Sequence, residues 1–120
     1  MARDVLFQET PKQDFYTLEN QDGSTGDVDE GAVEDYLEQM LHDPDQFVIL
    51  TPPAAQNGVR FVQARRQETQ IEAEIALQEE GGVRLYYKMV SPCQCRRIFL
   101  DYFRGAFFPD RAEYRPVEFL

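Results

Sequence analysis

Residues 69–90 read TQIEAEIALQEEGGVRLYYKMV, and this stretch decides the fold. Apolar and polar residues alternate over 69–78, which predicts a strand with one buried face. A second run over 83–90 is rich in aliphatic and aromatic residues, and Gly81 and Gly82 stand between the two runs. We therefore expect an antiparallel hairpin.

The register of this hairpin depends on its loop. A three-residue loop over 80–82 pairs Glu79 with Val83. Glu74 then lies beside Lys88 on the exposed face, where Arg60 of the preceding strand completes a ladder of charges in solvent. These pairings would account for the three charged residues without a catalytic role. The buried face would carry Ile71, Ala73, Ile75 and Leu77 on the first strand, and Leu85, Tyr87 and Met89 on the second.

Two further strands, 47–50 and 59–66, are predicted before the hairpin. On the second of them, Gln63 shares a face with Val59 and Phe61, which would direct its amide toward the helices. A buried glutamine needs hydrogen-bond partners. Gln63 is therefore either satisfied by the protein's own backbone or a ligand-binding residue.

A helix is expected on each side of these strands. Residues 29–42 carry an apolar stripe at helical spacing, made of Val33, Tyr36, Leu37, Met40 and Leu41. Ser91, Pro92 and Gln94 predict a capped helix start, and the helix runs over 92–104. Its buried stripe is Cys95, Ile98, Phe99, Tyr102 and Phe103, while Arg96, Arg97 and Arg104 point outward.

The predicted fold is a two-layer α+β domain of order α-β-β-β-β-α. A four-stranded antiparallel meander carries both helices on one face. We assign residues 29–120 to this single domain. Residues 1–28 form a polar segment that either adds an edge strand or is partly disordered. The aromatic tail, 106–120, is expected to pack back as a strand or an irregular cover.

Composition excludes several classes of partner. The chain has 120 residues, 22 acidic and 12 basic, with a net charge of −10. Direct nucleic-acid binding and binding to an anionic membrane both depend on clustered Lys and Arg, so neither is expected. No apolar run is long enough to span a membrane, and the N-terminus lacks the apolar stretch of a signal peptide. Because two cysteines do not make a disulfide scaffold, we expect a cytoplasmic protein.

The negative charge is concentrated in the first half of the chain, where residues 1–58 hold 13 acidic and 2 basic residues. Several of these acids recur on the outward face of the first helix at a spacing of four. Two interpretations stay open: a surface that only keeps the protein soluble, or a surface that binds a basic protein partner. The second predicts a partner-binding set of Asp27, Asp29, Glu30, Glu34, Asp35 and Glu38.

No pattern predicts catalysis, a metal or a cofactor. His42 is the only histidine, and Cys93 and Cys95 stand two apart on a helix, so their side chains do not face each other. Glu72 and Glu74 share a strand face as a glycosidase pair would. Without a cleft to hold a sugar, we interpret them as part of a solvated sheet face. We expect a non-enzymatic protein.

Part of the chain, residues 47–105, resembles a known family. The motifs are Phe61-Val62-Gln63, the glutamate-bearing strand Ile71–Leu77, a glycine hairpin, Leu85-Tyr86-Tyr87, and a helix end over Phe99–Gly105. Their order is similar to that in small immunity proteins of bacterial polymorphic-toxin and contact-dependent inhibition systems. The resemblance implies a cytoplasmic inhibitor that binds and blocks a cognate toxin.

Two other functions stay open. One is an acidic secretion chaperone that binds an extended segment of its effector. The other is a small-ligand-binding α+β module, which requires a concave pocket near Gln63 lined by polar groups with shifted pKa values. The sequence leaves open whether the protein is a monomer or a homodimer.

Overall fold

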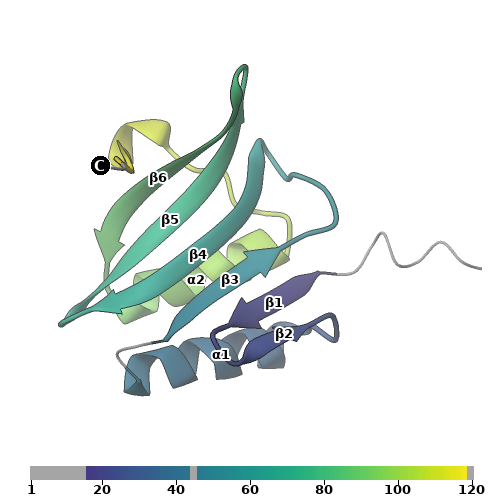
Figure 1. Ribbon diagram of the computed structural model, residues 1–120, viewed down its shortest axis with the longest axis vertical. Helices are drawn as coiled ribbons and strands as arrows, with labels where there is room; N and C mark the ends of the chain where they lie inside the picture. Colours follow the sequence, from purple (N-terminus) through teal and green to yellow (C-terminus); the bar gives the residue numbers. More distant parts are fainter. Residues whose placement is uncertain (1–15, 44–45, 119–120) are drawn as a thin grey trace, which may run out of the picture.

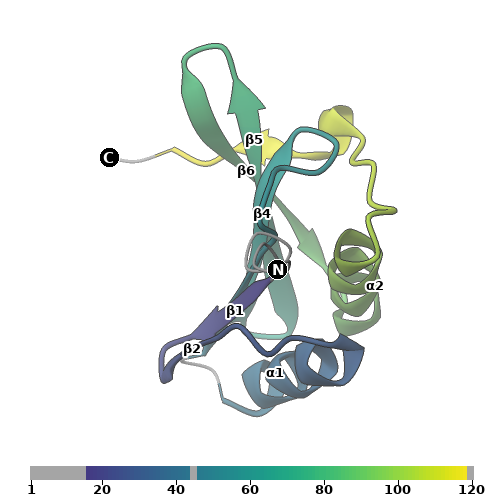
Figure 2. The ribbon, with the colours of Figure 1, turned by 90° about the vertical axis from the view of Figure 1, so that its right-hand side faces the viewer.

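The computed structural model describes residues 16–43 and 46–118. Seven antiparallel strands form one sheet in the order β2-β1-β3-β4-β5-β6-β7 (Figure 1). Both helices lie on the same face of this sheet (Figure 2). The elements are β1 (Thr17–Asn20), β2 (Gly23–Thr25), α1 (Glu30–His42), β3 (Phe47–Thr51), β4 (Val59–Gln67), β5 (Gln70–Glu79), β6 (Gly82–Val90), α2 (Pro92–Phe103), a short 3-10 helix (Arg111–Glu113) and β7 (Arg115–Pro116).

The protein is α+β, but the prediction of a four-stranded sheet is wrong. Three short strands extend the sheet at its edges: β1 lies beside β3, β2 lies beside β1, and β7 lies beside β6. Strands of two to four residues are too short to show a period in sequence, and pairing with a neighbour holds them. The polar segment 1–28 contains β1 and β2, and its first 15 residues lie outside the described part of the chain.

Both helices begin at capped residues. The Asp29 carboxylate accepts the Ala32 N–H at 2.8 Å at the start of α1. Ser91 and Gln94 form the reciprocal capping box expected for α2, and Pro92 occupies its first turn. Within the described ranges, neither helix is long and apolar enough to cross a membrane.

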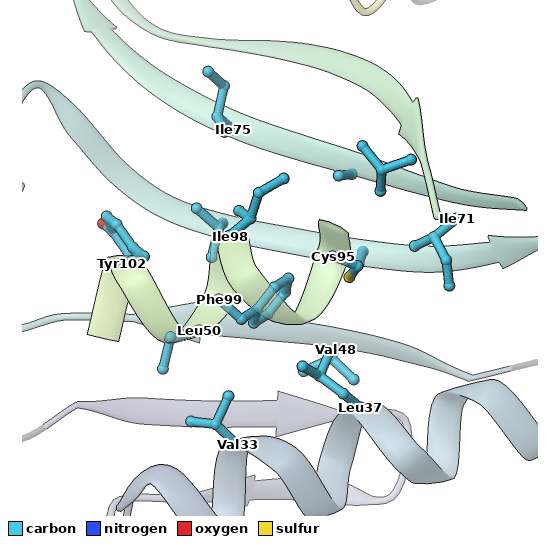
Figure 3. Close-up of a cluster of buried hydrophobic side chains, with 14 of the residues drawn as sticks. Val33, Leu37, Val48, Leu50, Ile71, Ile75, Cys95, Ile98, Phe99 and Tyr102 are labelled. Carbon is cyan, nitrogen blue, oxygen red and sulfur yellow. The ribbon is translucent and has the colours of Figure 1, made fainter. Parts of the chain in front are cut away.

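The core lies between the two helices and the sheet (Figure 3). The predicted stripes of α1 and α2 are confirmed at their most buried positions. Each fully buried aliphatic or aromatic side chain stabilises the fold by about 1.5–3 kcal/mol relative to an exposed one. The core includes Val33, Leu37 and Met40 of α1, Cys95, Ile98, Phe99 and Tyr102 of α2, and Val48, Leu50, Val62, Ile71, Ile75 and Tyr86 of the sheet.

The register of the β5–β6 hairpin differs by one residue from the expected one. Glu79 pairs with Gly82, so the turn has two residues rather than three. Gly82 has a φ of 126°, a backbone conformation that other residues rarely adopt, which lets the chain reverse one residue earlier. As a result Tyr86 faces the helices and Leu85 faces away. The apolar pattern favours the other register, because Val83, Leu85, Tyr87 and Met89 are all apolar whereas Arg84 and Lys88 stand on the side of Tyr86.

The hairpin between β4 and β5 contains a second departure. A β-bulge between Val59 and Phe61 sends these two side chains to opposite faces. Val59 is fully buried on the helix side. Gln63 stands two residues after Phe61 and therefore shares its face, which points away from the helices. The prediction that Gln63 points toward the helices is wrong.

The predicted ladder of Arg60, Glu74 and Lys88 is also wrong. Glu74 lies opposite Tyr87 on β6, not opposite Lys88. Lys88 projects to the helix side, where its ammonium lies 2.8 Å from Glu113. Arg60 donates a hydrogen bond to Gln78 at 2.9 Å. Both changes follow from the shorter turn and the bulge.

Candidate functional site on the helix-free face of the sheet

The sheet has one face that neither helix covers, which we call the outer face (Figure 2). Strand residues alternate between the core and this face, as the pleat requires. The outer face carries several apolar side chains, and Val83 and Met89 are 46% and 39% exposed. A concentration of exposed apolar side chains on a polar protein is a common mark of a binding surface. The partly exposed members are Phe47, Ile49, Phe61, Leu85 and Tyr87.

A concave site of about 360 Å³, which we call the outer hollow, lies on this face. Residues of β3, β4, β5 and β6 line it, together with Val117. Its volume is at the small end of the range for ligand pockets. Its apolar lining is Phe47, Ile49, Leu85 and Val117, and its polar lining is Gln63, Arg65, Glu72 and Glu74.

The polar groups of the outer hollow form two direct cross-strand pairs. Gln63 is opposite Glu74, and Arg65 is opposite Glu72. Side chains in such pairs have Cβ atoms about 4.5–5.5 Å apart, close enough for contact. The Gln63 amide donates to Glu74 Oε1 at 2.5 Å. The Arg65 guanidinium lies 3.5 Å from Glu72 Oε1, which also accepts from Gln67 at 3.1 Å.

Glu74 is an unusual residue for the middle of a sheet, because it is 8% exposed. The pKa of its carboxyl group is raised to about 7. Desolvation is the largest cause, and the neighbouring Glu72 carboxyl adds to it. The hydrogen bond from Gln63 acts in the opposite direction. Glu74 therefore keeps its proton to a higher pH than an ordinary glutamate does.

Glu72 has the opposite shift. The hydrogen bond from Glu74 is the largest cause that lowers its pKa, and Arg65 and Gln67 lower it too. The two neighbouring carboxyl groups thus have opposite shifts, and Glu74 holds its proton more firmly than Glu72 does. This is the behaviour of two close carboxyl groups in a poorly hydrated site.

Glu30, Glu34 and Glu38 lie on one face of α1, and we call them the acidic row. Two of these carboxylates have arginine partners. Arg104 makes two hydrogen bonds to Glu30, at 2.6 and 2.9 Å, and lowers the pKa of that carboxyl. Arg96 contacts Glu34 at 3.1 and 3.4 Å. Arg96 and Arg104 are exposed, as expected for the outward face of α2, and at the surface they join the two helices.

The other four predicted partner-binding residues have different surroundings. The Asp29 carboxylate caps α1. Glu38 lies 3.6 Å from the His42 ring. Within residues 16–43 and 46–118, neither Asp27 nor Asp35 forms an ion pair, and both are exposed. Partner binding by the set of six remains a prediction.

The sequence analysis placed Glu72 and Glu74 on one outward strand face but interpreted them as solvated. Gln63 was the residue placed wrongly, because the bulge on β4 turns it to the outer face, where it lies opposite Glu74. Among the described residues, no three or more His, Cys, Asp or Glu side chains group to hold a metal ion.

Comparisons with known proteins do not place the chain in a family. No family model, no curated protein and no solved structure matches it. The resemblance of residues 47–105 to immunity proteins therefore stays a prediction, and any function has to come from the geometry of the site.

Proposed function

We propose that this protein is a non-enzymatic binding module that holds a small amphipathic ligand in the outer hollow. The observation that carries the proposal is the position of Glu74, a nearly buried carboxyl group that lines an open hollow with apolar walls. Burying a carboxyl group without a cationic partner is costly, and a sheet face meant only for solvent gains nothing from it. A hollow with apolar walls and a few polar groups is typical of a ligand site.

The environment of the outer hollow supports binding rather than catalysis. Glu72 and Glu74 stand two residues apart on the same strand, β5, whereas the two carboxyl groups of a glycosidase flank the scissile bond at about 5 Å or more. Among the described residues, no His, Cys, Ser or Lys lines the hollow, so it offers no nucleophile paired with a base.

The test is a titration of the protein with short amphipathic molecules, followed by the amide NMR signals of each residue. The panel holds an alcohol, a carboxylate and an amine of equal chain length. We expect shifts centred on Gln63 and Glu74, and their loss in the Leu85→Trp variant, whose larger side chain fills the hollow. Met89→Trp is the matched control, since it changes the same strand and face but does not line the hollow.

The proposal fails if no member of the panel shifts these signals, or if Leu85→Trp leaves the shifts unchanged. A folded variant is required for the second result, and the dispersion of its amide signals reports this directly. Leu85 is only partly buried and faces away from the helices, so the larger side chain extends into the open hollow.

A second candidate function is binding of a basic protein partner by α1, as in an immunity-type inhibitor. The exposed carboxylates of Asp27, Asp35 and Glu38 support it, together with the concentration of negative charge in residues 1–58. The ion pairs at Glu30 and Glu34 reduce the charge that this surface offers. Reversing Asp35 and Glu38 to Lys should slow association with a basic partner and flatten its salt dependence. An unchanged association rate would remove this candidate.

A further inference from the structure

Resting on the proposed function, we propose that the polar end of the ligand is an alkylammonium group, which binds against the Glu72 and Glu74 carboxyl groups that line the outer hollow. On binding, any proton held by Glu74 leaves to the solvent. The site would then hold two carboxylates and one ammonium.

The charges around the outer hollow favour a cation over an anion. Arg65 is the one basic side chain that lines the hollow in the described part of the chain, and it already lies against Glu72. The Arg65 side chain is 59% exposed. No Lys or Arg among the described residues forms an ion pair with Glu74. A bound anion would face two carboxyl groups, whereas a cation supplies the ionic partner that Glu74 lacks.

The apolar lining selects the rest of the ligand. Phe47 and Ile49 of β3, Leu85 of β6 and Val117 surround the polar groups. An alkyl chain against these side chains leaves water, which contributes about 0.8 kcal/mol for each buried CH₂ group. A strongly hydrated inorganic cation gains nothing from such walls. The hollow therefore suits an organic amine rather than a free metal ion.

Exchange of a cation for a proton makes binding depend on pH. The charged or titratable groups that face Glu74 are Glu72 on its own strand, Arg65 on β4, Tyr87 on β6 and Arg115 on β7, while β3 contributes apolar side chains. Burial and the neighbouring Glu72 raise the pKa of Glu74 into the neutral range, so its charge changes there. With its pKa at about 7, we expect affinity for an amine to fall about 30-fold between pH 8 and pH 5.5.

The experiment compares pentylammonium, pentan-1-ol and pentanoate at pH 8 and pH 5.5, by amide NMR titration of the full chain. We expect pentylammonium to bind most tightly and to lose affinity at pH 5.5. Glu74→Gln should remove this pH dependence, and Glu19→Gln, an exposed carboxyl on the same sheet face, should keep it. As a second readout on the unmodified protein, carbon-13 NMR of the Glu74 carboxyl should show its pKa fall by at least one unit at saturating pentylammonium.

The outcomes separate the two proposals. Equal affinity for pentan-1-ol and pentylammonium, or an affinity for pentylammonium that does not change with pH, overturns the inference and leaves the ligand site intact. Tighter binding of pentanoate would do the same. If none of the three compounds shifts the signals of Gln63 and Glu74, the proposed function fails and the inference fails with it.

Discussion

The side-chain amide of Gln63 and the carboxyl group of Glu74 lie directly opposite each other on β4 and β5, joined by a hydrogen bond of 2.5 Å on the face that neither helix covers. Their strand neighbours, Val62 and Ile75, pair on the other face and are fully buried in the core. The same two strands therefore supply the centre of the core and the centre of the outer hollow. Changes to the polar pair act on a rigid part of the molecule.

Replacing Glu74 with Gln should stabilise the protein more at pH 8.5 than at pH 5. The pKa of Glu74 is about 7 in the folded protein against 4.5 as its ordinary value, so between these values the folded chain holds a proton that the unfolded chain releases. The contribution of this group to stability is full below pH 4.5 and is lost as the pH rises to about 7. Glutamine resembles the protonated form at every pH.

The expected difference is about 1–2 kcal/mol in the free energy of unfolding, less than the full shift implies because the hollow is open to solvent. Urea unfolding at the two pH values measures it. Glu19→Gln is the control, because Glu19 is exposed on the same sheet face. A Glu74→Gln effect that is equal at both pH values would show that Glu74 titrates normally.

Replacing Gln63 with Leu should raise the pKa of Glu74 above about 7. The Gln63 amide donates to the Glu74 carboxyl and favours its charged form, so removing the donor favours the protonated form. Carbon-13 NMR titration of the carboxyl measures the change. Gln78→Leu is the control, because Gln78 lies on the strand and face of Glu74. It should leave the titration of Glu74 unchanged. A lower pKa in Gln63→Leu would contradict the assigned hydrogen bond.

Replacing Tyr102 with Phe should cost about 0.5–1.5 kcal/mol of stability, the net value of one hydrogen bond. The buried Tyr102 hydroxyl donates to the Val59 carbonyl at 2.7 Å. That carbonyl also accepts from the Gln56 N–H at 2.9 Å, so it is not left without a partner and the larger penalty does not apply. Tyr36→Phe, at a partly buried position, should cost less. Equal losses in urea unfolding would mean that the buried hydroxyl contributes nothing specific.

Replacing Arg96 and Arg104 with Gln should reduce stability slightly at low salt and not at high salt. Both arginines pair with α1 carboxylates at the surface, where salt screens the attraction. Arg104 lowers the pKa of Glu30, so this pair stabilises the fold at neutral pH and is lost as the pH falls through the lowered pKa. Arg97→Gln is the control, an exposed arginine of the same helix. Thermal unfolding over a range of NaCl concentrations measures the change in stability. A loss of stability that persists at high salt would contradict a screened ion pair.

Much of the fold was predictable because it depends on local patterns. The stripe of α1, the capping box of Ser91 and Gln94, and the strands around residues 69–90 all depend on spacing over a few residues. The edge strands were not predictable to the same degree. β7 has two residues, and only its pairing with β6 makes it a strand.

The candidate site was harder to predict, because it depends on register. A turn of two residues instead of three moves Glu74 from Lys88 to Tyr87, and a bulge at Val59 moves Gln63 to the outer face. Each event shifts a strand by one position, which exchanges its two faces. The apolar pattern of β6 even points to the other register, because its outward residues are all apolar while Arg84 and Lys88 lie on the helix side.

For the acidic row, too, the sequence predicts the positions of the charges but not their partners. The spacing of Glu30, Glu34 and Glu38 on one helix face is a property of the sequence, because a helix brings every fourth residue to the same side. Whether those charges are free is decided by the angle and distance at which α2 packs, which sets Arg96 and Arg104 against them. The amino-acid order by itself determined the helices, the central strands and the uneven charge, since these follow from local spacing. Only the tertiary structure decided which charges are neutralised and which carboxyl groups meet in the outer hollow, because ion pairs and buried carboxyl groups depend on contacts between segments far apart in the chain.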